Sequence, residues 1–370
     1  MVTTLKILEL CLSPSLGGNE LYVERIGRAL EGAGHQVTYA LKEKGRLAGR
    51  IRGSVTLLKQ RIPYADLPTA LAVLRMVRAV RADALHVHVT TDLPLAAFAK
   101  TFCPGLRVVY TKQMQPGGPK KDLFHRWVYG RIDLLLAATE QMRVRLVDLL
   151  PMEPGRIKRL YLGTSLPDIA AKPAMRREVR NRYGHADSDF LILFPNRLDP
   201  QKGQELLIEA LRLLKPRAVT PRVIFAGAET VGCEGYKASL QSVVDTAGVA
   251  RQCTFTGFIE DLGPLYAAAD IVALATREET FGMVLIEGMA WSTPVIGSNA
   301  GGVPEIIDHG RNGFLFASMD AGSLAATIER CVRERETLPG LGRAARLTVE
   351  NKFSFENHVR QFDGYLQKND

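Results

Sequence analysis

The sequence predicts an α/β protein in which two domains are each built around a parallel sheet. Short apolar runs of strand length alternate with amphipathic helical stretches along the whole chain, which is typical of successive βαβ units. The length of 370 residues is sufficient for two domains that each bury a core. A polar, charged linker follows residues 160–165, and the fully apolar strand 190–194 then opens a second series. We therefore predict a first domain over 1–163 and a second over 164–352.

The first domain begins with a strand, a glycine-containing turn, a helix and a second strand. These elements occupy 4–12, 13–20, 21–32 and 35–40, and their order is the start of a Rossmann-like sheet. The turn contains Gly17-Gly18, which does not match Gly-x-Gly-x-x-Gly, so a dinucleotide-dependent dehydrogenase is poorly supported. Glycines here either form a plain tight turn or let the backbone approach a ligand phosphate or sugar.

The later elements continue the same alternation. In the first domain we expect strands at 84–88, 107–111 and 132–137 and helices at 71–80, from 91, and at 124–129. In the second domain we expect strands at 190–194, 223–226, 271–274 and 294–296 and helices at 204–214 and 283–291. A last amphipathic helix is expected at 353–366.

Charge is unevenly distributed between the two halves. Residues 1–165 carry 25 Lys and Arg against 13 Asp and Glu, whereas the remainder carries 23 against 26. The basic half indicates an anionic partner, and its stretch 42–61 either contacts an anionic membrane or lipid phosphate or forms a solvated face. No nucleic-acid-binding motif occurs and no aromatic residues are interleaved for base stacking, so we expect no nucleic-acid partner.

The composition predicts a globular protein of a reducing compartment. No apolar run approaches the roughly 18 residues that span a bilayer, and the chain opens on a strand rather than a cleavable signal. The five cysteines are scattered without Cys-x-x-Cys, which favours neither a disulfide framework nor a zinc site. We expect a cytoplasmic protein. The alternative is a protein attached peripherally to the cytoplasmic face of the membrane.

The stretch 276–305 carries the clearest chemistry. A strand leads into a polar turn with Glu279, Gly282 opens a short apolar helix, and Glu287 lies about two turns from Glu279. The N–H groups and positive dipole end of that helix form an anion site, and the two carboxylates can accept hydrogen bonds from hydroxyls. Either glutamate alone would be an ordinary surface charge. Together they suit a ligand with a phosphate core and hydroxyl groups on both sides.

The full string resembles the signature of retaining GT-B glycosyltransferases of family four. The resemblance rests on two glutamates around Phe281-Gly282, then Pro294-Val295-Ile296 and Gly301-Gly302-x-x-Glu305, and extends in weaker form over nearly the whole chain. It implies a GT-B architecture, two Rossmann-like domains with parallel sheets facing a central cleft, with the final helix (353–370) packing back on the first domain. It also implies sugar transfer with retention from a nucleotide-diphosphate sugar, without a metal or cofactor, to a glycan or lipid-linked acceptor.

The resemblance assigns roles on the donor side. Arg197 and Lys202, in Arg-Leu-x-x-x-Lys-Gly, would stabilise the leaving diphosphate. Glu279 would act at the transferred sugar, and Glu287 would bind the ribose. The other implied donor contacts are Gly257, Phe258 and Ile259 at the nucleobase and Thr280, Phe281, Gly282 and Met283 at the helix entry.

In the first domain the resemblance covers three places. Gly17-Gly18-x-Glu20 would face the donor sugar and diphosphate, with Glu20 toward the acceptor. Gln113 stands where the family usually has a histidine, so it can hydrogen-bond a sugar but cannot carry a proton. His86 and His88 lie on one face of a strand and are acceptor-side candidates. No third ligand is evident beside them, so we predict no metal site.

Ser292 is a further departure, because the family usually has glycine there. In a left-handed helix cap a serine costs roughly 1 kcal/mol. Two other functions stay open at this point. A sugar-nucleotide epimerase has a similar two-domain fold but needs an acid and a base, for which His86 and His88 are the main candidates. A non-catalytic nucleotide-sugar binding protein would need the donor site alone.

Overall fold

The computed structural model describes residues 3–60, 62, 64, 66–215, 219–230 and 232–367. Arg61, in the basic stretch, lies outside the described residues. The chain forms two compact units: unit 1 comprises Met1–Tyr161 with His358–Asp370, and unit 2 comprises Leu162–Asn357. These bounds lie close to the sequence-based limits at 163 and 352. Each unit is α/β with a parallel sheet, and this confirms the predicted fold class.

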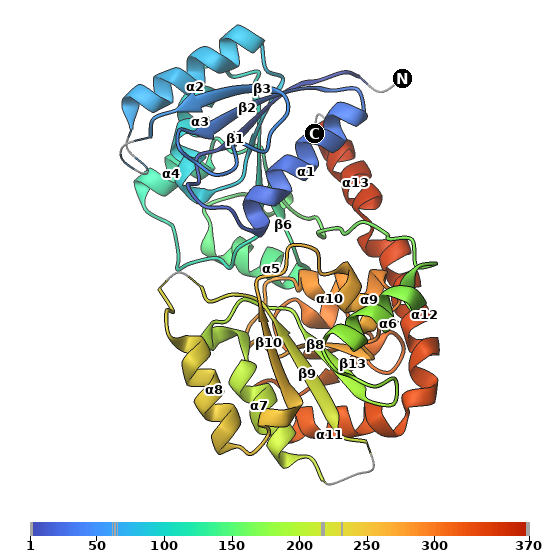
Figure 1. Ribbon diagram of the computed structural model, residues 1–370. Coiled ribbons are helices and arrows are strands. Elements are labelled where there is room, and N and C mark those ends of the chain that lie inside the picture. Colours follow the sequence, from blue (N-terminus) through green and yellow to red (C-terminus); the bar gives the residue numbers. More distant parts are fainter. Residues whose placement is uncertain are drawn as a thin grey trace. The chain divides into compact units, whose positions relative to one another are not determined.

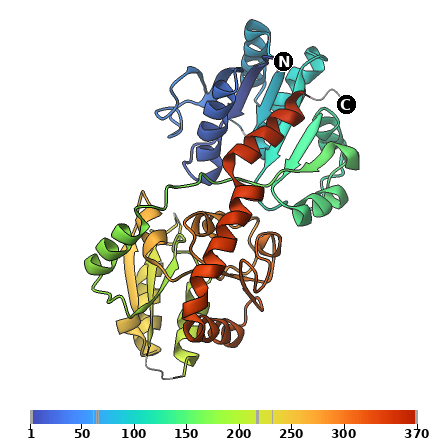
Figure 2. The ribbon, with the colours of Figure 1, turned by 90° about the vertical axis from the view of Figure 1, so that its right-hand side faces the viewer.

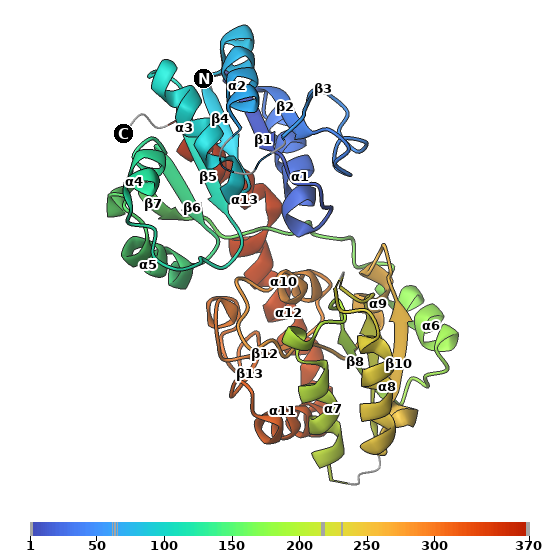
Figure 3. The same ribbon diagram turned by 90° about the vertical axis from the view of Figure 1, so that its left-hand side faces the viewer.

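Within its described residues, unit 1 contains a seven-stranded sheet with the order β3-β2-β1-β4-β5-β6-β7 (Figure 3). The strands are β1 (Lys6–Cys11), β2 (Gln36–Lys42), β3 (Ser54–Leu58), β4 (Ala84–Val87), β5 (Arg107–Lys112), β6 (Leu134–Ala137) and β7 (Ile157–Arg159). Neighbouring strands pair in parallel. Because β1 lies between β2 and β4, the winding reverses there, as in doubly wound folds.

The helices of unit 1 connect successive strands. They are α1 (Gly18–Gly32), α2 (Leu67–Val80), α3 (Leu93–Phe102), α4 (Leu123–Tyr129) and α5 (Glu140–Leu149). Local sequence sets several starts: Asp66 accepts the Thr69 N–H ahead of α2, and Thr139 accepts the Met142 N–H ahead of α5. Each cap satisfies a backbone donor that the helix itself leaves unpaired.

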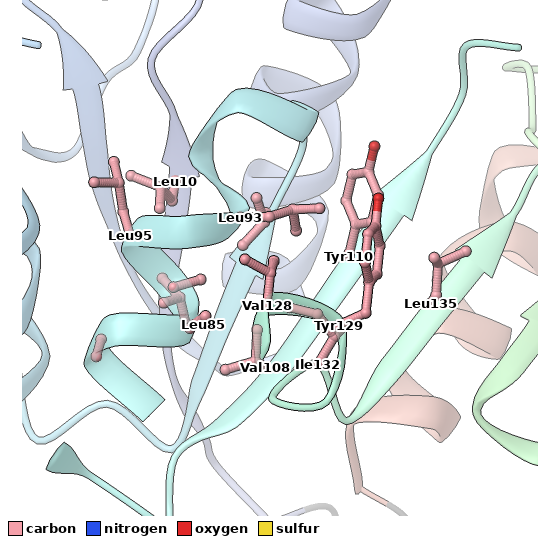
Figure 4. Close-up of a cluster of buried hydrophobic side chains, with 14 of the residues drawn as sticks. Leu10, Leu85, Leu93, Leu95, Val108, Tyr110, Val128, Tyr129, Ile132 and Leu135 are labelled. Atoms are coloured by element: carbon pink, nitrogen blue, oxygen red, sulfur yellow. The ribbon is translucent and has the colours of Figure 1, made fainter. Parts of the chain in front are cut away.

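Both faces of a parallel sheet are covered, so the central strands of the unit 1 sheet are largely apolar. Pairing of β4 with β5 places Leu85 beside Val108, and pairing of β5 with β6 places Tyr110 beside Leu135. These side chains belong to one buried cluster with Leu93 at the start of α3 (Figure 4). Removing this surface from water is the main favourable term in folding.

Unit 2 contains, in the part that the structure describes, a six-stranded parallel sheet with the order β10-β9-β8-β11-β12-β13 (Figure 1). Its strands are β8 (Phe190–Phe194), β9 (Pro221–Ala226), β10 (Cys253–Gly257), β11 (Ile271–Leu274), β12 (Val295–Ser298) and β13 (Gly313–Phe316). Its helices are α6 (Lys172–Arg182), α7 (Gln204–Leu213), α8 (Tyr236–Thr246), α9 (Gly263–Ala268), α10 (Met283–Ala290), α11 (Ala321–Arg333) and α12 (Leu338–Thr348). The winding reverses at β8, which lies between β9 and β11.

The last helix, α13 (Phe355–Gln367), is divided between the two units. Its residues up to Asn357 belong to unit 2, and those from His358 onward belong to unit 1. At its start the Phe355 N–H donates to the Thr164 carbonyl within unit 2. From His358 onward it packs on unit 1, as the C-terminal red helix in Figure 2 shows. There Phe362 is fully buried, and its ring centroid lies 4.6 Å from that of the His86 imidazole. Unit 1 therefore completes its core with a segment from the end of the chain.

Candidate functional site

The carboxyl ends of β8 and β11 define the candidate site in unit 2. These strands pair with each other, and β8 is the strand at which the sheet order reverses. In open α/β sheets, ligands bind in the crevice at such a point. The loop after β8 carries Arg197 and Lys202, and the loop after β11 carries Glu279. The fold thus brings the three predicted catalytic residues to one edge of one sheet.

Lys202 and Glu279 contact each other directly. The Lys202 Nζ donates to Glu279 Oε2 at 3.3 Å, and the side chains are only 26% and 18% exposed. The second carboxylate oxygen, Oε1, accepts the Thr280 N–H at 3.2 Å. The guanidinium of Arg197 is exposed and forms no ion pair within the described residues. One cation is therefore already oriented and a second is open to a ligand.

Two glycines allow the site loops to pack this closely. Gly203 has a φ of +81°, and a Cβ there would lie 2.1 Å from the Ala275 carbonyl oxygen. Gly301 has a φ of +60°, and a Cβ there would lie 2.1 Å from the Glu279 carbonyl oxygen. The Gly302 N–H donates to that same oxygen at 2.8 Å. Any side chain at 203 or 301 would push the loops apart.

The N-terminus of α10 adds an anion-binding feature. Gly282 precedes the helix with a φ of +109°, and no side chain caps the first turn within the described residues. A helix start without a side-chain cap leaves N–H groups that can donate hydrogen bonds to an anion, and here the first of them is that of Met283. The ring of Phe281 is 2% exposed and packs edge-on against Phe353, with centroids 5.8 Å apart. Only the backbone of Phe281 can therefore serve a ligand.

Glu287 is held by a tyrosine that no sequence pattern singled out. Its Oε2 accepts a hydrogen bond from the Tyr266 hydroxyl at 2.7 Å. Burial, with the charge of Glu287, raises the pKa of Tyr266 well above its usual range, so the hydroxyl stays a donor. Tyr266 lies in the apolar helix α9, where the sequence pattern predicts that a tyrosine packs in the hydrophobic core. The contact fixes the orientation of the carboxylate.

The predicted nucleobase loop follows β10 beside a cavity. Gly257 ends the strand with a φ of +74°, Phe258 is 75% exposed and Ile259 is half-buried. The next residue, Glu260, lines a cavity of about 340 Å³ in unit 2 together with Glu287. The cavity therefore joins the loop to the second glutamate.

In unit 1, the glycine turn leads directly into α1. Gly17 and Gly18 are exposed at the helix start, and Gly17 occupies the N-cap position. Glu20 is buried, and its Oε2 accepts the Gly17 N–H at 2.8 Å. The carboxylate of Glu20 is thus engaged in closing the first turn of the helix.

His86 and His88 belong to a buried cluster with Glu9, which the sequence analysis did not identify as a partner. Glu9 in β1 pairs with His86 in β4, so the three side chains share one face of the sheet. Glu9 Oε2 accepts from His86 Nδ1 at 2.9 Å and from His88 Nε2 at 2.5 Å. The three side chains have no exposed surface, and their donor atoms lie within 4.8 Å of one another. The third potential ligand that the sequence did not reveal therefore exists, and here it bridges two imidazoles by hydrogen bonds.

Burial and the contacts among the three side chains together set the charge within this cluster. Burial raises the pKa of Glu9, but its interactions with His86 and then His88 outweigh burial and bring the pKa down to about 2. Burial, then the charge of His86, lowers the pKa of His88 to about 4. Glu9 is therefore ionised and His88 neutral at neutral pH. A charged residue within the apolar run 4–12 was the signal in the sequence for a buried partner.

Gln113 follows β5 and carries an unused donor. Its Nε2 is buried and has no hydrogen-bond partner within the described part of the chain. Buried amides are normally paired, so such a group indicates a place for a ligand acceptor. Burial, with the nearby charge of Lys120, lowers the pKa of the preceding Lys112 to about 8. Lys112 is a titratable group beside Gln113 that the sequence did not distinguish from other surface lysines.

Two doubly wound units, one with a cation–carboxylate pair beside an open helix start, are the architecture of a GT-B type glycosyltransferase. The family profile described as "Glycosyl transferases group 1" matches residues 175–348, and that described as "Glycosyltransferase Family 4" matches residues 16–166. The chain belongs to this glycosyltransferase family.

Curated relatives share moderate identity with the chain. It is 29% identical to EpsD of Bacillus subtilis over 298 residues, which cover 76% of this chain and 77% of that one. It is 29% identical over 238 residues to a D-inositol 3-phosphate glycosyltransferase of Gordonia bronchialis, covering 63% of this chain and 51% of the relative. The chain therefore spans only about half the length of that second relative.

Solved structures share the fold over almost the whole chain. HepE of Anabaena, solved with UDP and glucose, gives a TM-score of 0.84 at 23% identity, covering 98% of this chain and 100% of that one. A glycosyltransferase of Rickettsia africae gives 0.88 at 20% identity, with 99% and 100% covered. In the residues that the structure describes, no helix is both long and apolar enough to cross a membrane.

Proposed function

We propose that the protein transfers a sugar from a nucleotide-diphosphate sugar to an acceptor with retention of configuration, without a metal ion. The observation that carries this proposal is the Lys202–Glu279 ion pair at the β8–β11 edge of unit 2, beside the uncapped start of α10. The cation suits a diphosphate, and the carboxylate suits a sugar hydroxyl. The family to which the chain belongs supports the same chemistry.

In the proposed reaction, the bond between the anomeric carbon of the sugar and the diphosphate oxygen breaks. Arg197 and Lys202 stabilise the negative charge that develops on the diphosphate. The acceptor hydroxyl attacks the same face of the sugar, and its proton moves to the departing phosphate oxygen. Because the departing phosphate takes that proton, no separate protein base is required, and a glutamine at 113 is compatible. Glu279 accepts a hydrogen bond from the transferred sugar.

The nucleoside end of the donor is proposed to lie at Glu287. A carboxylate held by Tyr266 can accept hydrogen bonds from two ribose hydroxyls, and the adjoining cavity of about 340 Å³ is of a size to admit a nucleoside. Phe258, which is largely exposed two residues before the cavity-lining Glu260, offers a ring face for a base. The complexes of HepE with UDP and with UDP-glucose support a uridine nucleotide as the first to test.

We further propose that the acceptor is a phosphate-bearing or lipid-linked glycan met at the cytoplasmic face of a membrane. The basic first half of the chain supports this, as do relatives named for D-inositol 3-phosphate and phosphatidylinositol monomannoside acceptors. Flotation with anionic and with neutral liposomes tests the membrane contact. Binding should favour anionic vesicles and be released by salt, whereas equal partition to both would contradict it.

A turnover assay tests the main proposal. The purified protein is incubated with a panel of nucleotide sugars, with and without a metal chelator, and the released nucleotide diphosphate is measured. Release should persist with the chelator, and NMR of a transferred product should show the anomeric configuration of the donor. Nucleotide-sugar binding with neither hydrolysis nor transfer would instead support a binding protein, and interconversion of the donor sugar an epimerase.

A further inference from the structure

A cavity of about 610 Å³ lies in unit 1 at the amino-terminal edge of its sheet. Its walls are formed by Lys100, Arg107 at the start of β5, Asp133, Glu153, Arg156 and Lys158 in β7. Gly17, His88 and Gln113 all follow the carboxyl ends of strands in the same unit, so the cavity is at the opposite edge of the sheet. It is therefore separate from every residue discussed above.

Two of the four cations maintain the cavity wall. Lys100 Nζ lies 2.9 Å from Asp133 Oδ2 and 2.6 Å from the Leu106 carbonyl oxygen. The same Asp133 oxygen accepts the Val108 N–H at 2.7 Å. Arg156 donates to the Ile132 carbonyl oxygen. These contacts join the amino-terminal ends of β5 and β6.

The other two cations, Arg107 and Lys158, form no ion pair and no side-chain hydrogen bond within the described residues. The Nε of Arg107 is buried and has no acceptor there. A buried guanidinium nitrogen without an acceptor is unfavourable, because it has lost its hydrogen bonds to water and has formed none with the protein. The wall carries four cations against the two carboxylates of Asp133 and Glu153, so it has a net positive charge.

We propose that this cavity binds the phosphate monoester group of a small hydroxylated molecule. A guanidinium fork and an ammonium group are the usual partners of a phosphate, and the phosphate would supply the acceptors that Arg107 and Lys158 lack. Glu153 and Tyr365 of α13 also line the cavity and provide hydrogen-bonding groups for hydroxyls. The volume lies in the range of small-molecule sites. The phosphate belongs either to a soluble ester or to a lipid headgroup.

Titration calorimetry at low salt with glycerol 3-phosphate tests the soluble source. The wild type should bind saturably, and the double variant Arg107→Gln/Lys158→Gln should bind at least tenfold more weakly. The matched control Arg75→Gln/Arg78→Gln removes the same charge from exposed positions on α2 and should stay within twofold of the wild type. Arg197→Gln/Lys202→Gln, which alters the proposed diphosphate site, should also stay within twofold.

Vesicles with and without phosphatidic acid test the lipid source with the same variants. Binding of either probe that is lost only in Arg107→Gln/Lys158→Gln supports the proposal and identifies the source. Equal loss in the α2 control, loss confined to Arg197→Gln/Lys202→Gln, or no saturable binding of either probe would overturn it. The single variant Lys158→Gln, whose side chain is only half-buried, repeats the test if the double variant fails to fold. The thermal transition without phosphate checks folding.

Discussion

The ammonium nitrogen of Lys202 and the carboxylate oxygen Oε2 of Glu279 lie 3.3 Å apart, although the residues are 77 positions apart in the chain. The pair joins the loops after two neighbouring strands, so each side chain orients the other. Glu287, by contrast, is held by Tyr266. The two glutamates thus have different partners, and their losses should have different consequences.

Glu279→Ala should lower kcat and leave the affinity for the nucleotide diphosphate close to wild type, because Glu279 is assigned to the transferred sugar. Glu287→Ala should raise the donor KM and weaken diphosphate binding by about 1.5–3 kcal/mol, the range for hydrogen bonds to a charged group. Steady-state kinetics and nucleotide titration measure both. Glu279→Gln keeps the shape and removes the charge. Full activity and binding in both alanine variants would place the site elsewhere.

Gln113→Ala should weaken turnover by roughly 1–2 kcal/mol of transition-state free energy, because one hydrogen bond to the donor sugar is lost. The shape of the pH–rate profile should not change, since glutamine does not titrate. Met114→Ala, at the exposed next position, is the control and should have little effect. A limb near pH 8 that disappears in Gln113→Ala would mean that the glutamine positions Lys112, whose pKa is lowered to about 8.

Gly301→Ala should lower both turnover and thermal stability, because its Cβ would overlap the Glu279 carbonyl oxygen. Gly248→Ala is a matched control: Gly248 also has a positive φ, of +71°, but a Cβ there meets nothing within 4 Å. Both variants bear the left-handed strain of roughly 1–2 kcal/mol. Only the first should reduce kcat, and similar kinetics in the two would show that the Glu279 loop tolerates displacement.

Ser292→Gly should stabilise the protein by up to about 1 kcal/mol, because glycine relieves the left-handed backbone, less the entropy that glycine adds to the unfolded chain. Ser292 does have a left-handed backbone conformation, with a φ of +54°. Chemical denaturation measures the change. Ser292→Ala retains the Cβ and should show no gain. A loss of stability in the glycine variant would imply that the serine hydroxyl has a structural role.

Asp92→Asn should change the pH dependence of stability in unit 1. Burial raises the pKa of Asp92 to about 7, although its Oδ2 accepts the Leu12 N–H at 2.7 Å. Its folded pKa exceeds its unfolded one, so its stabilising contribution is full below about pH 4 and is lost as pH rises toward 7. The wild type should therefore lose stability relative to Asp92→Asn over that window. A difference in unfolding free energy that is constant with pH would contradict this.

The sequence predicted most of the strands that are buried on both faces, because continuous apolar runs such as 190–194 have few other interpretations. It missed the four-residue β13 (Gly313–Phe316), which is mostly buried, the exposed edge strand β3 (Ser54–Leu58) and the three-residue β7 (Ile157–Arg159). It also missed β10 (Cys253–Gly257), of which the proposed nucleobase contact Gly257 is the last residue. Short or exposed strands are defined by their neighbours, which a local pattern does not contain.

For the candidate site, the sequence indicated the groups whose type and spacing suit a phosphate and a sugar. It did not indicate their supports. Tyr266 lies in an apolar helix, where the local pattern predicts a core residue. The bridge that Glu9 forms between His86 and His88 depends on the pairing of β1 with β4, which are distant in sequence. Contacts of this kind follow from strand order and register, which no local spacing encodes.

The division of α13 between the two units has a consequence for synthesis on the ribosome. His358 Nδ1 donates to the Tyr161 carbonyl oxygen and its Nε2 accepts from the Tyr22 hydroxyl, so this late segment closes the first unit. Unit 2, Leu162–Asn357, is translated between the two parts. At about 5–20 residues per second, the nascent first unit waits roughly 10–40 s for its last helix. During that interval the His86 side chain lacks its contact with the Phe362 ring, and the face of the sheet that carries it is open to a chaperone.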